Sequence, residues 1–187
     1  MNETPGDFDP RGFIPPAPTS DAERLRVFLD KWEIHEVLMR YCRALDREDE
    51  QLLRSVVHPD SVWVRGTNVQ RGPQVVPDLL GLTKNGTSTT GMHTICNELI
   101  EVYGDVALSE CYWVSYSAGT ANGQDYTAET AGRYEDRWER REDRQWKIAH
   151  RTFLIEWMRS DPAVKRDLGR DFKPGVRSRA DISYRPV

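Results

Sequence analysis

The hydrophobic pattern of this chain changes once, from a helical period to an alternating one. Between Ile34 and Leu45 the apolar residues recur at i, i+3, i+4, i+7, i+8 and i+11, which is typical of one face of an α-helix. From Met92 onward the period is two, which is typical of β-strands. The alternation predicts four long strands, over residues 92–103, 106–118, 125–141 and 145–157. Helices followed by consecutive strands predict an α+β fold and not an alternating α/β fold.

The first helix has a recognisable start and end. Residues 20–23 (Ser-Asp-Ala-Glu) have the pattern of a capping box, so a helix should begin there. Its apolar stripe breaks near Asp46, and a short second helix should follow over residues 52–57. A curved, mixed or antiparallel sheet wrapped around the long first helix would form a cone-shaped α+β barrel. The inward residues of each strand would then line a cavity.

Proline and glycine divide the stretch between the helices and the long strands. Residues 58–60 (His-Pro-Asp) should form a turn, because proline restricts the residue before it. Residues 61–66 alternate as a strand. Residues 72–82 should form a short helical stretch that Pro77 interrupts, and residues 84–91 read as a loop.

The length of 187 residues predicts one domain with additional terminal segments. Residues 1–19 contain five of the eleven prolines and should form an arm without a core of its own. Residues 20–158 should form the folded domain. Residues 159–187 carry eight Lys or Arg and four Asp. This basic tail should lie over the barrel, reach a neighbouring subunit or be disordered.

Charge and composition narrow the class of partner. The net charge of −4 argues against nucleic acid, which requires a basic face. No apolar run approaches the roughly 18 residues of a membrane span, and the N-terminus lacks the regions of a secretory signal. Three cysteines at irregular spacing read as reduced thiols, which favours a cytoplasmic protein. No metal-binding or phosphate-binding motif is visible, so we expect neither a metal nor a cofactor.

His93 and Asp46 are the residues whose chemistry suggests an enzyme. A neutral imidazole can take up and release a proton at cellular pH, and a carboxylate beside it can orient the ring and stabilise the imidazolium. This pair is the minimum equipment for removing a proton from carbon without a metal or cofactor. Each residue also has a simpler interpretation: His93 as a hydrogen-bonded wall residue, and Asp46 as a solvated acid at a helix end.

Four sequence motifs together resemble a known family. They are Arg-Tyr-Cys-Arg-Ala-Leu-Asp at 40–46, His-x-x-x-Asn at 93–97, the charged run at 132–141 and Trp-Lys-Ile-Ala-His-Arg at 146–151. In this order and spacing they resemble the SnoaL-like branch of the nuclear transport factor 2-like superfamily, over about residues 25–158. The superfamily includes scytalone dehydratase, bile acid 7α-dehydratase, hexachlorocyclohexane dehydrochlorinase, ketosteroid isomerase and polyketide cyclases. It also includes members that are not catalytic.

The resemblance implies roles for four catalytic residues. The dehydrochlorinase family uses an Asp–His dyad and an arginine near the end of the last strand, which implies these roles for Asp46, His93 and Arg151. The dehydratase branch has a tyrosine five residues before the aspartate, which implies that Tyr41 donates a proton or hydrogen bond to a leaving oxygen. Tyr41 lies on the apolar stripe, so it can equally be a core residue. Positions 41 and 46 are also about 140° apart on an ideal helix, unless the helix unwinds before Asp46.

Six further residues are candidates for substrate binding: Arg65, Asn97, Tyr116, Tyr134, Trp138 and His150. Relatives place an Asp or His on the strand after the histidine, where this chain has Tyr116 or Ser117, so the general acid stays open. Tyr134 and Trp138 share one face of their strand. Without a bulge, strand alternation would turn His150 inward and Arg151 outward, so Arg151 rests on the resemblance.

These observations favour a cofactor-independent lyase of the dehydratase type, acting on a small aromatic or alicyclic molecule. Isomerisation, retro-aldol C–C cleavage and polyketide cyclisation use the same groups and stay open. A non-catalytic ligand-binding or subunit-assembly domain is the alternative of a different class. The resemblance also implies a homo-oligomer, a trimer or a dimer.

Overall fold

The computed structural model of this protein describes residues 15, 17–84, 88–163 and 173–185. The predicted arm, residues 1–19, therefore lies largely outside the described residues. In chain order the elements are α1 (Asp21–Asp46), α2 (Glu50–Val56), β1 (Val57–Arg65), β2 (Asn68–Arg71), the 3-10 turn η2 (Gly72–Gln74), α3 (Val75–Lys84), β3 (Ser88–Tyr103), β4 (Val106–Ala121), β5 (Gln124–Arg140), β6 (Trp146–Pro162) and the 3-10 turn η3 (Ile182–Tyr184).

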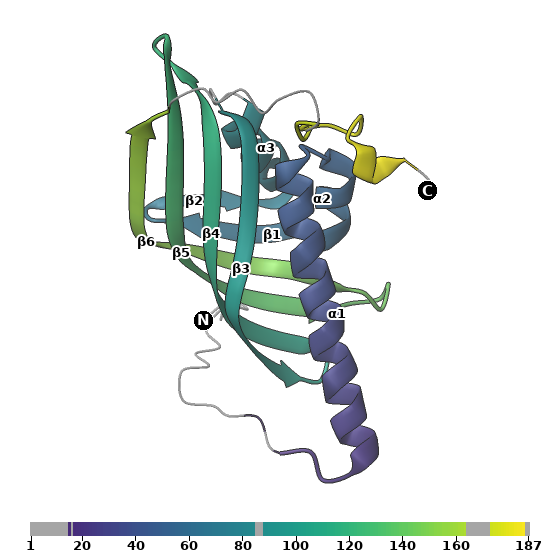
Figure 1. The fold of residues 1–187 in the computed structure, drawn as a ribbon. Helices are drawn as coiled ribbons and strands as arrows, with labels where there is room; N and C mark the ends of the chain where they lie inside the picture. The colour runs from purple at the N-terminus through teal and green to yellow at the C-terminus, as the bar shows by residue number, and fades with distance from the viewer. Residues whose placement is uncertain (1–14, 16, 85–87, 164–172, 186–187) are drawn as a thin grey trace.

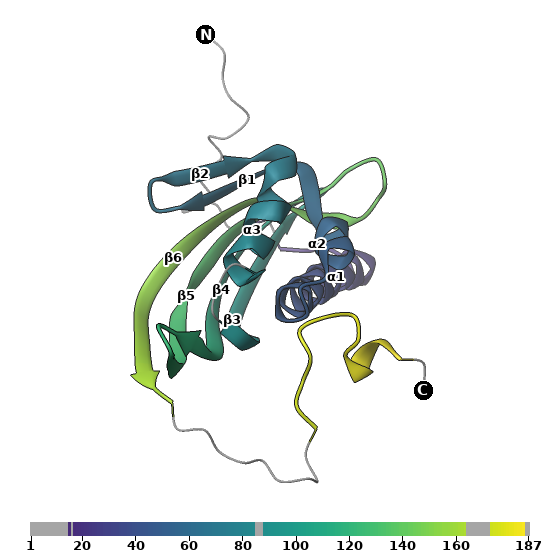
Figure 2. The ribbon, with the colours of Figure 1, turned by 90° about the horizontal axis from the view of Figure 1, so that it is seen from above.

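One mixed sheet of six strands, in the order β2-β1-β6-β5-β4-β3, forms the body of the protein. Neighbouring strands are antiparallel except β1 and β6, which are parallel. The long strands curve, and α1 and α3 lie on the concave side of the sheet (Figure 1, Figure 2). Over the described strands the sheet stays open, with β2 and β3 at its two edges. The predicted α+β fold, a curved sheet around a long N-terminal helix, is confirmed.

The predicted start of α1 is confirmed. Ser20 is the N-cap, and its hydroxyl accepts a hydrogen bond from the Glu23 backbone N–H at 3.2 Å. The helix continues without a break to Asp46, so the expected unwinding before that residue is wrong. Both sides of α1 can meet the sheet because the sheet curves around it. Tyr41 packs against Trp63 and Tyr134, while Asp46 reaches β3.

The core lies between α1, α3 and the concave face of the sheet. Its largest fully buried side chains include Trp63, Trp138, Tyr41 and Tyr134. Burying each large ring removes apolar surface from water, which contributes about 25 cal/mol per Å². The two indoles keep hydrogen-bond partners: Trp63 Nε1 donates to Ser61 at 3.1 Å, and Trp138 Nε1 to Ser109 at 2.8 Å.

Two predictions based on proline are wrong. The turn expected at His58–Asp60 is part of β1, which begins at Val57. Pro59 is tolerated there because the pairing of β1 with β6 shifts register between Val57 and Val62. The interruption expected at Pro77 is also absent from α3, because this proline lies in the first turn, where its missing N–H has no helical partner.

Several of the long strands extend past one of their predicted limits. β3 begins at Ser88, inside the segment read as a loop, and β6 continues to Pro162. The hairpins at 103–105 and 142–144 form where they were predicted. Residues 173–185, from the predicted basic tail, pack against α1 and α2 and are called here the C-terminal segment (Figure 2).

Candidate functional site

Asp46 and His93 form a hydrogen-bonded pair between the last residue of α1 and β3. The His93 Nδ1 lies 2.7 Å from Asp46 Oδ1, and the His93 backbone N–H donates to Asp46 Oδ2 at 3.2 Å. The two side chains are 17% and 14% exposed. The carboxylate favours the tautomer with its proton on Nδ1, which leaves Nε2 as the basic nitrogen. Among the described residues, none hydrogen-bonds Nε2.

The pairing with His93 offsets an unfavourable position of Asp46 at the carboxyl end of α1. A carboxylate is disfavoured at the carboxyl end of a helix, where carbonyl dipoles point outward. The two N–H donors of His93 offset that repulsion by holding both oxygens of Asp46. The side chain of Asp46 is thereby fixed in one orientation, and the imidazole with it.

Arg151 is fully buried in a second polar cluster. Its Nε and Nη2 donate to the two oxygens of Asp136, each at 2.6 Å, and neither side chain is exposed. Burial alone would lower the pKa of Arg151, but the charge and hydrogen bonds of Asp136 raise it above its ordinary value. Burial likewise favours a raised pKa for Asp136, which the guanidinium opposes. Because arginine keeps its proton and both bonds are short, we describe the pair as ionised.

Three aromatic rings enclose the Arg151 guanidinium. Its carbon lies 3.9 Å from the ring centre of Tyr134, 4.3 Å from that of Tyr41 and 5.2 Å from that of Trp63. Ring faces attract a cation, and more strongly when water is excluded. Arg151 is thus attached to the core on several sides. Only the third guanidinium nitrogen, Nη1, has no partner among the described residues.

A bulge in β6 turns Arg151 inward. On β5, the buried residues Asp136 and Trp138 are two positions apart. Their buried partners on β6, Arg151 and Ile148, are three positions apart. The extra residue, Ala149, breaks the alternation. The expectation that His150 faces inward is therefore wrong. His150 pairs with Arg137 on the opposite face, where burial lowers its pKa.

Three buried donors without a described partner lie around Tyr134. They are the Tyr41 hydroxyl, Arg151 Nη1 and Trp113 Nε1. Tyr41 meets the Tyr134 ring edge-on at 6.0 Å, and Trp113 stacks on it at 5.2 Å. Leaving a buried donor unpaired costs about 1–3 kcal/mol, so a group of three indicates a place for an acceptor. Burial raises the pKa of Tyr41 to about 12, so its hydroxyl stays a neutral donor.

The donors and the dyad share the concave face of the sheet. Trp113 pairs with Ile95, two residues after His93 on the same face of β3. Tyr134 is one strand further across, and it packs against Tyr41, five residues before Asp46. The expected face shared by Tyr134 and Trp138 is confirmed, but Trp138 is fully buried and bonded to Ser109.

The structure does not bring the other candidates to the dyad. Arg65 hydrogen-bonds Gln70 and lies over the Phe153 ring at 5.4 Å. Asn97 is exposed, with a positive φ of 51°, at the irregularity in β3 between Cys96 and Leu99.

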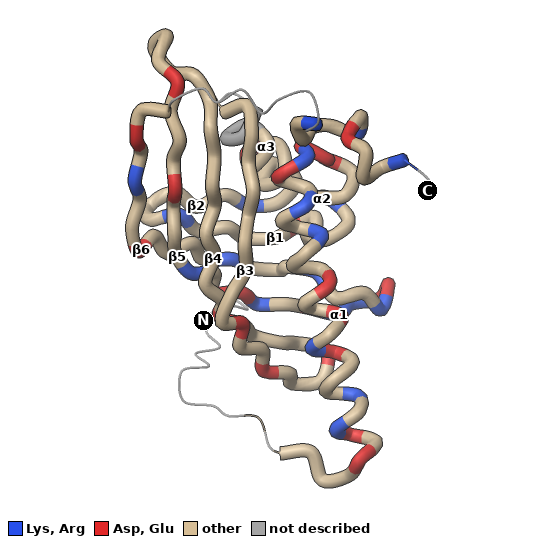
Figure 3. The backbone as a smooth tube through the Cα atoms, in the orientation of Figure 1, with Lys and Arg blue, Asp and Glu red and all other residues tan. Residues whose placement is uncertain are grey.

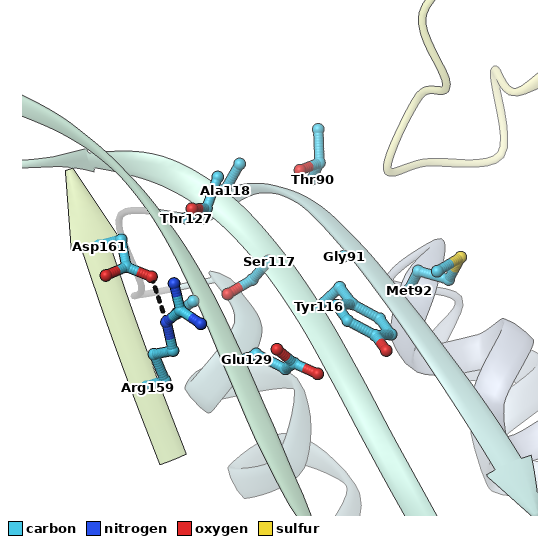
Figure 4. Close-up of a pocket in the computed structure, with 11 residues that line it drawn as sticks. Thr90, Gly91, Met92, Tyr116, Ser117, Ala118, Thr127, Glu129, Arg159 and Asp161 are labelled. Atoms are coloured by element: carbon cyan, nitrogen blue, oxygen red, sulfur yellow. Dashed lines mark hydrogen bonds and ion pairs between the residues drawn. The ribbon is translucent and has the colours of Figure 1, made fainter. Parts of the chain in front are cut away.

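Tyr116 lies on the opposite face of β4 from the partner of His93, because His93 pairs with the preceding residue, Ser115. Together with Glu129 and Arg159 it lines a surface hollow of about 470 Å³ (Figure 4). Neither His93 nor Asp46 lines this hollow.

Three residues near these clusters were missed by the sequence reasoning. Asp136 lies between Tyr134 and Trp138 on the buried face of β5, so strand alternation could have identified it. Trp113 lies two residues after the buried Cys111 on β4, so strand alternation places both side chains on the buried face. Arg177, in the C-terminal segment, donates to the Leu45 carbonyl beside Asp46, and no pattern in the tail pointed to it.

A family model described as a SnoaL-like domain matches residues 26–152. Among solved structures, a hexachlorocyclohexane dehydrochlorinase from Novosphingobium barchaimii superposes with a TM-score of 0.66 at 20% identity, covering 80% of this chain and 100% of the other. A putative scytalone dehydratase from Novosphingobium aromaticivorans superposes with a TM-score of 0.62 at 18% identity, covering 76% of this chain and 95% of the other. A protein of unknown function from Mycobacterium tuberculosis superposes with a TM-score of 0.58 at 27% identity, covering 69% of this chain and 77% of the other. No curated protein sequence matches significantly.

The described residues include neither a membrane-spanning helix nor a cluster of metal ligands. No helix there is long and apolar enough to cross a membrane. No group of three or more His, Cys, Asp or Glu in the same part of the chain could hold a metal ion.

Proposed function

The chain belongs to the SnoaL-like domain family, and we propose that it is a cofactor-independent lyase that removes a carbon-bound proton from a small aromatic or alicyclic substrate. Dehydration is the reaction we propose first. The observation that carries the proposal is the 2.7 Å hydrogen bond between His93 Nδ1 and Asp46 Oδ1. The dehydrochlorinase and the putative scytalone dehydratase, which have the same fold, support a lyase-type reaction.

His93 is the proposed base. Its Nε2 takes the proton from carbon, and the electron pair of the broken C–H bond forms a new double bond as hydroxide leaves the neighbouring carbon. Asp46 accepts the Nδ1–H and stabilises the imidazolium, so it is the positioning residue of the pair. The imidazolium then gives its proton to the departing hydroxide, which leaves as water, and the base is restored.

The buried donors would hold the charge that builds up during this reaction. Removing a proton from carbon next to an acceptor group pushes negative charge onto that group, and preorganised donors stabilise it. Arg151 Nη1, the Tyr41 hydroxyl and Trp113 Nε1 are such donors. In this proposal Arg151 acts through its one unpaired nitrogen, while its pairing with Asp136 fixes its position.

The base assignment is tested by replacing the dyad. Hydroxylated aromatic and alicyclic compounds are screened for turnover, and the rate of the best substrate is compared between wild type, His93→Ala and Asp46→Asn. We expect His93→Ala to lose about 10²-fold or more in kcat while the fold is retained, as for other general bases. Tyr116→Phe, on the opposite face of the sheet, is the matched control and should keep its rate. Undiminished turnover by His93→Ala would refute the assignment.

The same base and donors fit other reactions. Isomerisation and polyketide cyclisation also begin with proton removal from carbon beside an acceptor group. In retro-aldol C–C cleavage the base would instead take the proton of a β-hydroxyl group, and the broken C–C bond would leave an enolate that the same donors stabilise. Mass spectrometry of the product distinguishes them, because dehydration loses water, C–C cleavage gives two fragments and isomerisation leaves the mass unchanged. A non-catalytic ligand-binding or subunit-assembly domain is the remaining alternative, and it predicts binding without turnover.

We also propose a homo-oligomer in the cytoplasm. On α1, four exposed apolar side chains follow helical spacing: Leu25, Phe28, Leu29 and Trp32. A continuous exposed apolar stripe is typical of an interaction surface. Light scattering of wild type and of a Phe28→Glu variant tests this, because a smaller mass for the variant is expected if the stripe is the interface.

A further inference from the structure

We propose that Arg177 is a substrate-binding residue beside the dyad and that it recognises a carboxylate, or another anionic oxygen, of the substrate. This inference rests on the proposed function, since it names the class of molecule on which His93 and Asp46 would act. Arg177 belongs to the C-terminal segment, which lies next to the carboxyl end of α1 (Figure 2).

The guanidinium of Arg177 lies between neighbours of both dyad residues. Its Nη2 donates to the carbonyl of Leu45, the residue before the dyad aspartate, and its Nη1 to the Ser88 hydroxyl, both at 3.3 Å. Its central carbon lies 3.5 Å from the position that a Cβ on Gly91 would occupy. Gly91 precedes His93 by two residues and shares its face of β3, about 7 Å along the strand. A molecule in contact with the imidazole can therefore reach the guanidinium.

The guanidinium has more donors than the described residues satisfy. Arginine carries five N–H donors, and only two of them donate to described residues, both at the long end of hydrogen-bonding distance. Its Nε is buried without a hydrogen-bond partner in the described structure. The Glu48 carboxylate lies 3.6 Å from that nitrogen. The side chain as a whole is 13% exposed.

These features point to an anionic oxygen ligand. A cation removed from water is unfavourable unless acceptors surround it, and a ligand carboxylate would supply two. The planar fork of a guanidinium matches the two oxygens of a carboxylate. Gly91 has no side chain to occupy the space next to the guanidinium. The substrate would thus present its carboxylate to Arg177 and a C–H bond in another part of the molecule to His93.

The C-terminal segment holds Arg177 in place from its far side. The buried Asp181 carboxylate accepts hydrogen bonds from the backbone N–H groups of Val176 at 2.9 Å and Ser183 at 3.0 Å. Hydrogen bonds from Ser183 and Val176 lower the pKa of Asp181, so it stays charged. The Tyr184 hydroxyl donates to Asp49 at 2.8 Å. Figure 3 shows charges of both signs where this segment meets α1 and α2.

The test uses benzoate as a probe and its neutral analogue benzamide as the comparison. Binding to the full-length wild type and to Arg177→Met is followed by NMR, through the imidazole resonances of His93, and by calorimetry. The control variant is Arg179→Met, which removes a guanidinium of the same segment that bonds Gln51 instead. We expect Arg177→Met to weaken benzoate at least tenfold and benzamide less than twofold, with Arg179→Met unchanged for both. Arg177→Lys should restore part of the benzoate affinity, since it keeps the charge but not the fork.

Three outcomes overturn the proposal. Benzoate that binds Arg177→Met as tightly as wild type excludes Arg177 from recognition. An equal loss of benzoate and benzamide shows a structural role only, and urea unfolding of Arg177→Met checks for that effect independently. No perturbation of His93 by benzoate in wild type excludes an anion site beside the dyad.

The failure of this proposal and that of the proposed function are distinguishable. His93→Ala tests the base through turnover, whereas benzoate binding to Arg177 does not need the imidazole. A His93→Ala variant that keeps both turnover and Arg177-dependent benzoate binding would refute the base and retain the anion site.

Discussion

Asp136 and Arg151 lie directly opposite each other on β5 and β6 and are joined by two hydrogen bonds of 2.6 Å in a part of the core that water does not reach. Asp136→Asn would leave the guanidinium charged and buried without a counter-ion. We expect it to lower the free energy of unfolding by about 3–5 kcal/mol, measured by urea denaturation.

The chain offers a matched control for this pair. Arg133 and Glu156 also join β5 to β6, at 2.8 Å, but on the solvent side of the sheet. Glu156→Gln should change stability by less than about 1 kcal/mol. The double variant Asp136→Leu with Arg151→Met should be less destabilised than Asp136→Asn alone, because it leaves no unpaired charge. An Asp136→Asn variant as stable as wild type would mean that the pair is not ionised.

Gly132 has no room for a side chain. A Cβ there would lie 1.9 Å from the carbonyl oxygen of Leu154 and 3.1 Å from the Trp113 ring. Gly132→Ala should therefore separate β5 from β6 and lower the free energy of unfolding by about 3 kcal/mol or more. Gly175→Ala, where no described atom lies within 4 Å of the added Cβ, should change it by less than about 1 kcal/mol. Equal melting temperatures for the two variants would contradict this packing.

Removing the Tyr41 hydroxyl should lower activity without lowering stability. It is buried and forms no well-aligned hydrogen bond with a described residue, although the Arg151 guanidinium lies close enough to act on its pKa. Tyr41→Phe therefore removes no strong hydrogen bond of the fold. We expect unchanged stability, or a gain of up to about 1 kcal/mol, in thermal unfolding. If the hydroxyl binds the substrate, kcat should fall about tenfold on the substrate identified for wild type. Unchanged kcat would remove Tyr41 from the reaction.

His58 makes stability depend on pH. It is buried, its Nε2 lies 3.0 Å from the Glu139 carbonyl oxygen, and burial lowers its pKa below the ordinary value. Below about pH 6.5 the unfolded chain binds a proton that the folded chain does not, so folding weakens as the pH falls. His58→Gln lacks this dependence, and its stability deficit relative to wild type should shrink from pH 7.5 to pH 5.

Urea unfolding of both proteins at several pH values measures that difference. The other charges near His58, which include Arg141, Glu139 and Lys147, are common to both proteins and cancel in the comparison. A constant difference between the two curves would show that His58 does not titrate differently on folding.

The sequence was sufficient for the parts of the fold that depend on periodicity. The helical stripe of α1 and the alternation of the four long strands predicted the curved sheet around a helix, because burial of one face dictates both patterns. The pairing of Asp46 with His93 came from the resemblance, and the structure places the two side chains in contact. Their role in catalysis stays a prediction.

Other features depend on contacts that the sequence does not display. The extra residue in β6 reverses which of His150 and Arg151 is buried, and nothing in the local sequence marks Ala149 as a bulge. His58 looked like a turn residue because the parallel pairing of β1 with β6 involves distant parts of the chain. Arg177 gained its position from tertiary contacts made by a segment with little periodicity of its own.

The bulge at Ala149 has a consequence for how such proteins diverge. Strict alternation through the same residues, without the bulge, would turn His150 inward and Arg151 outward, exchanging a permanent cation for a titratable imidazole at the base of the concave face. Deleting the alanine would instead leave Arg151 inward, because His150 would then directly follow Ile148. A homologue that keeps this residue but loses the bulge would thus differ in pocket chemistry without any change in its aligned residues.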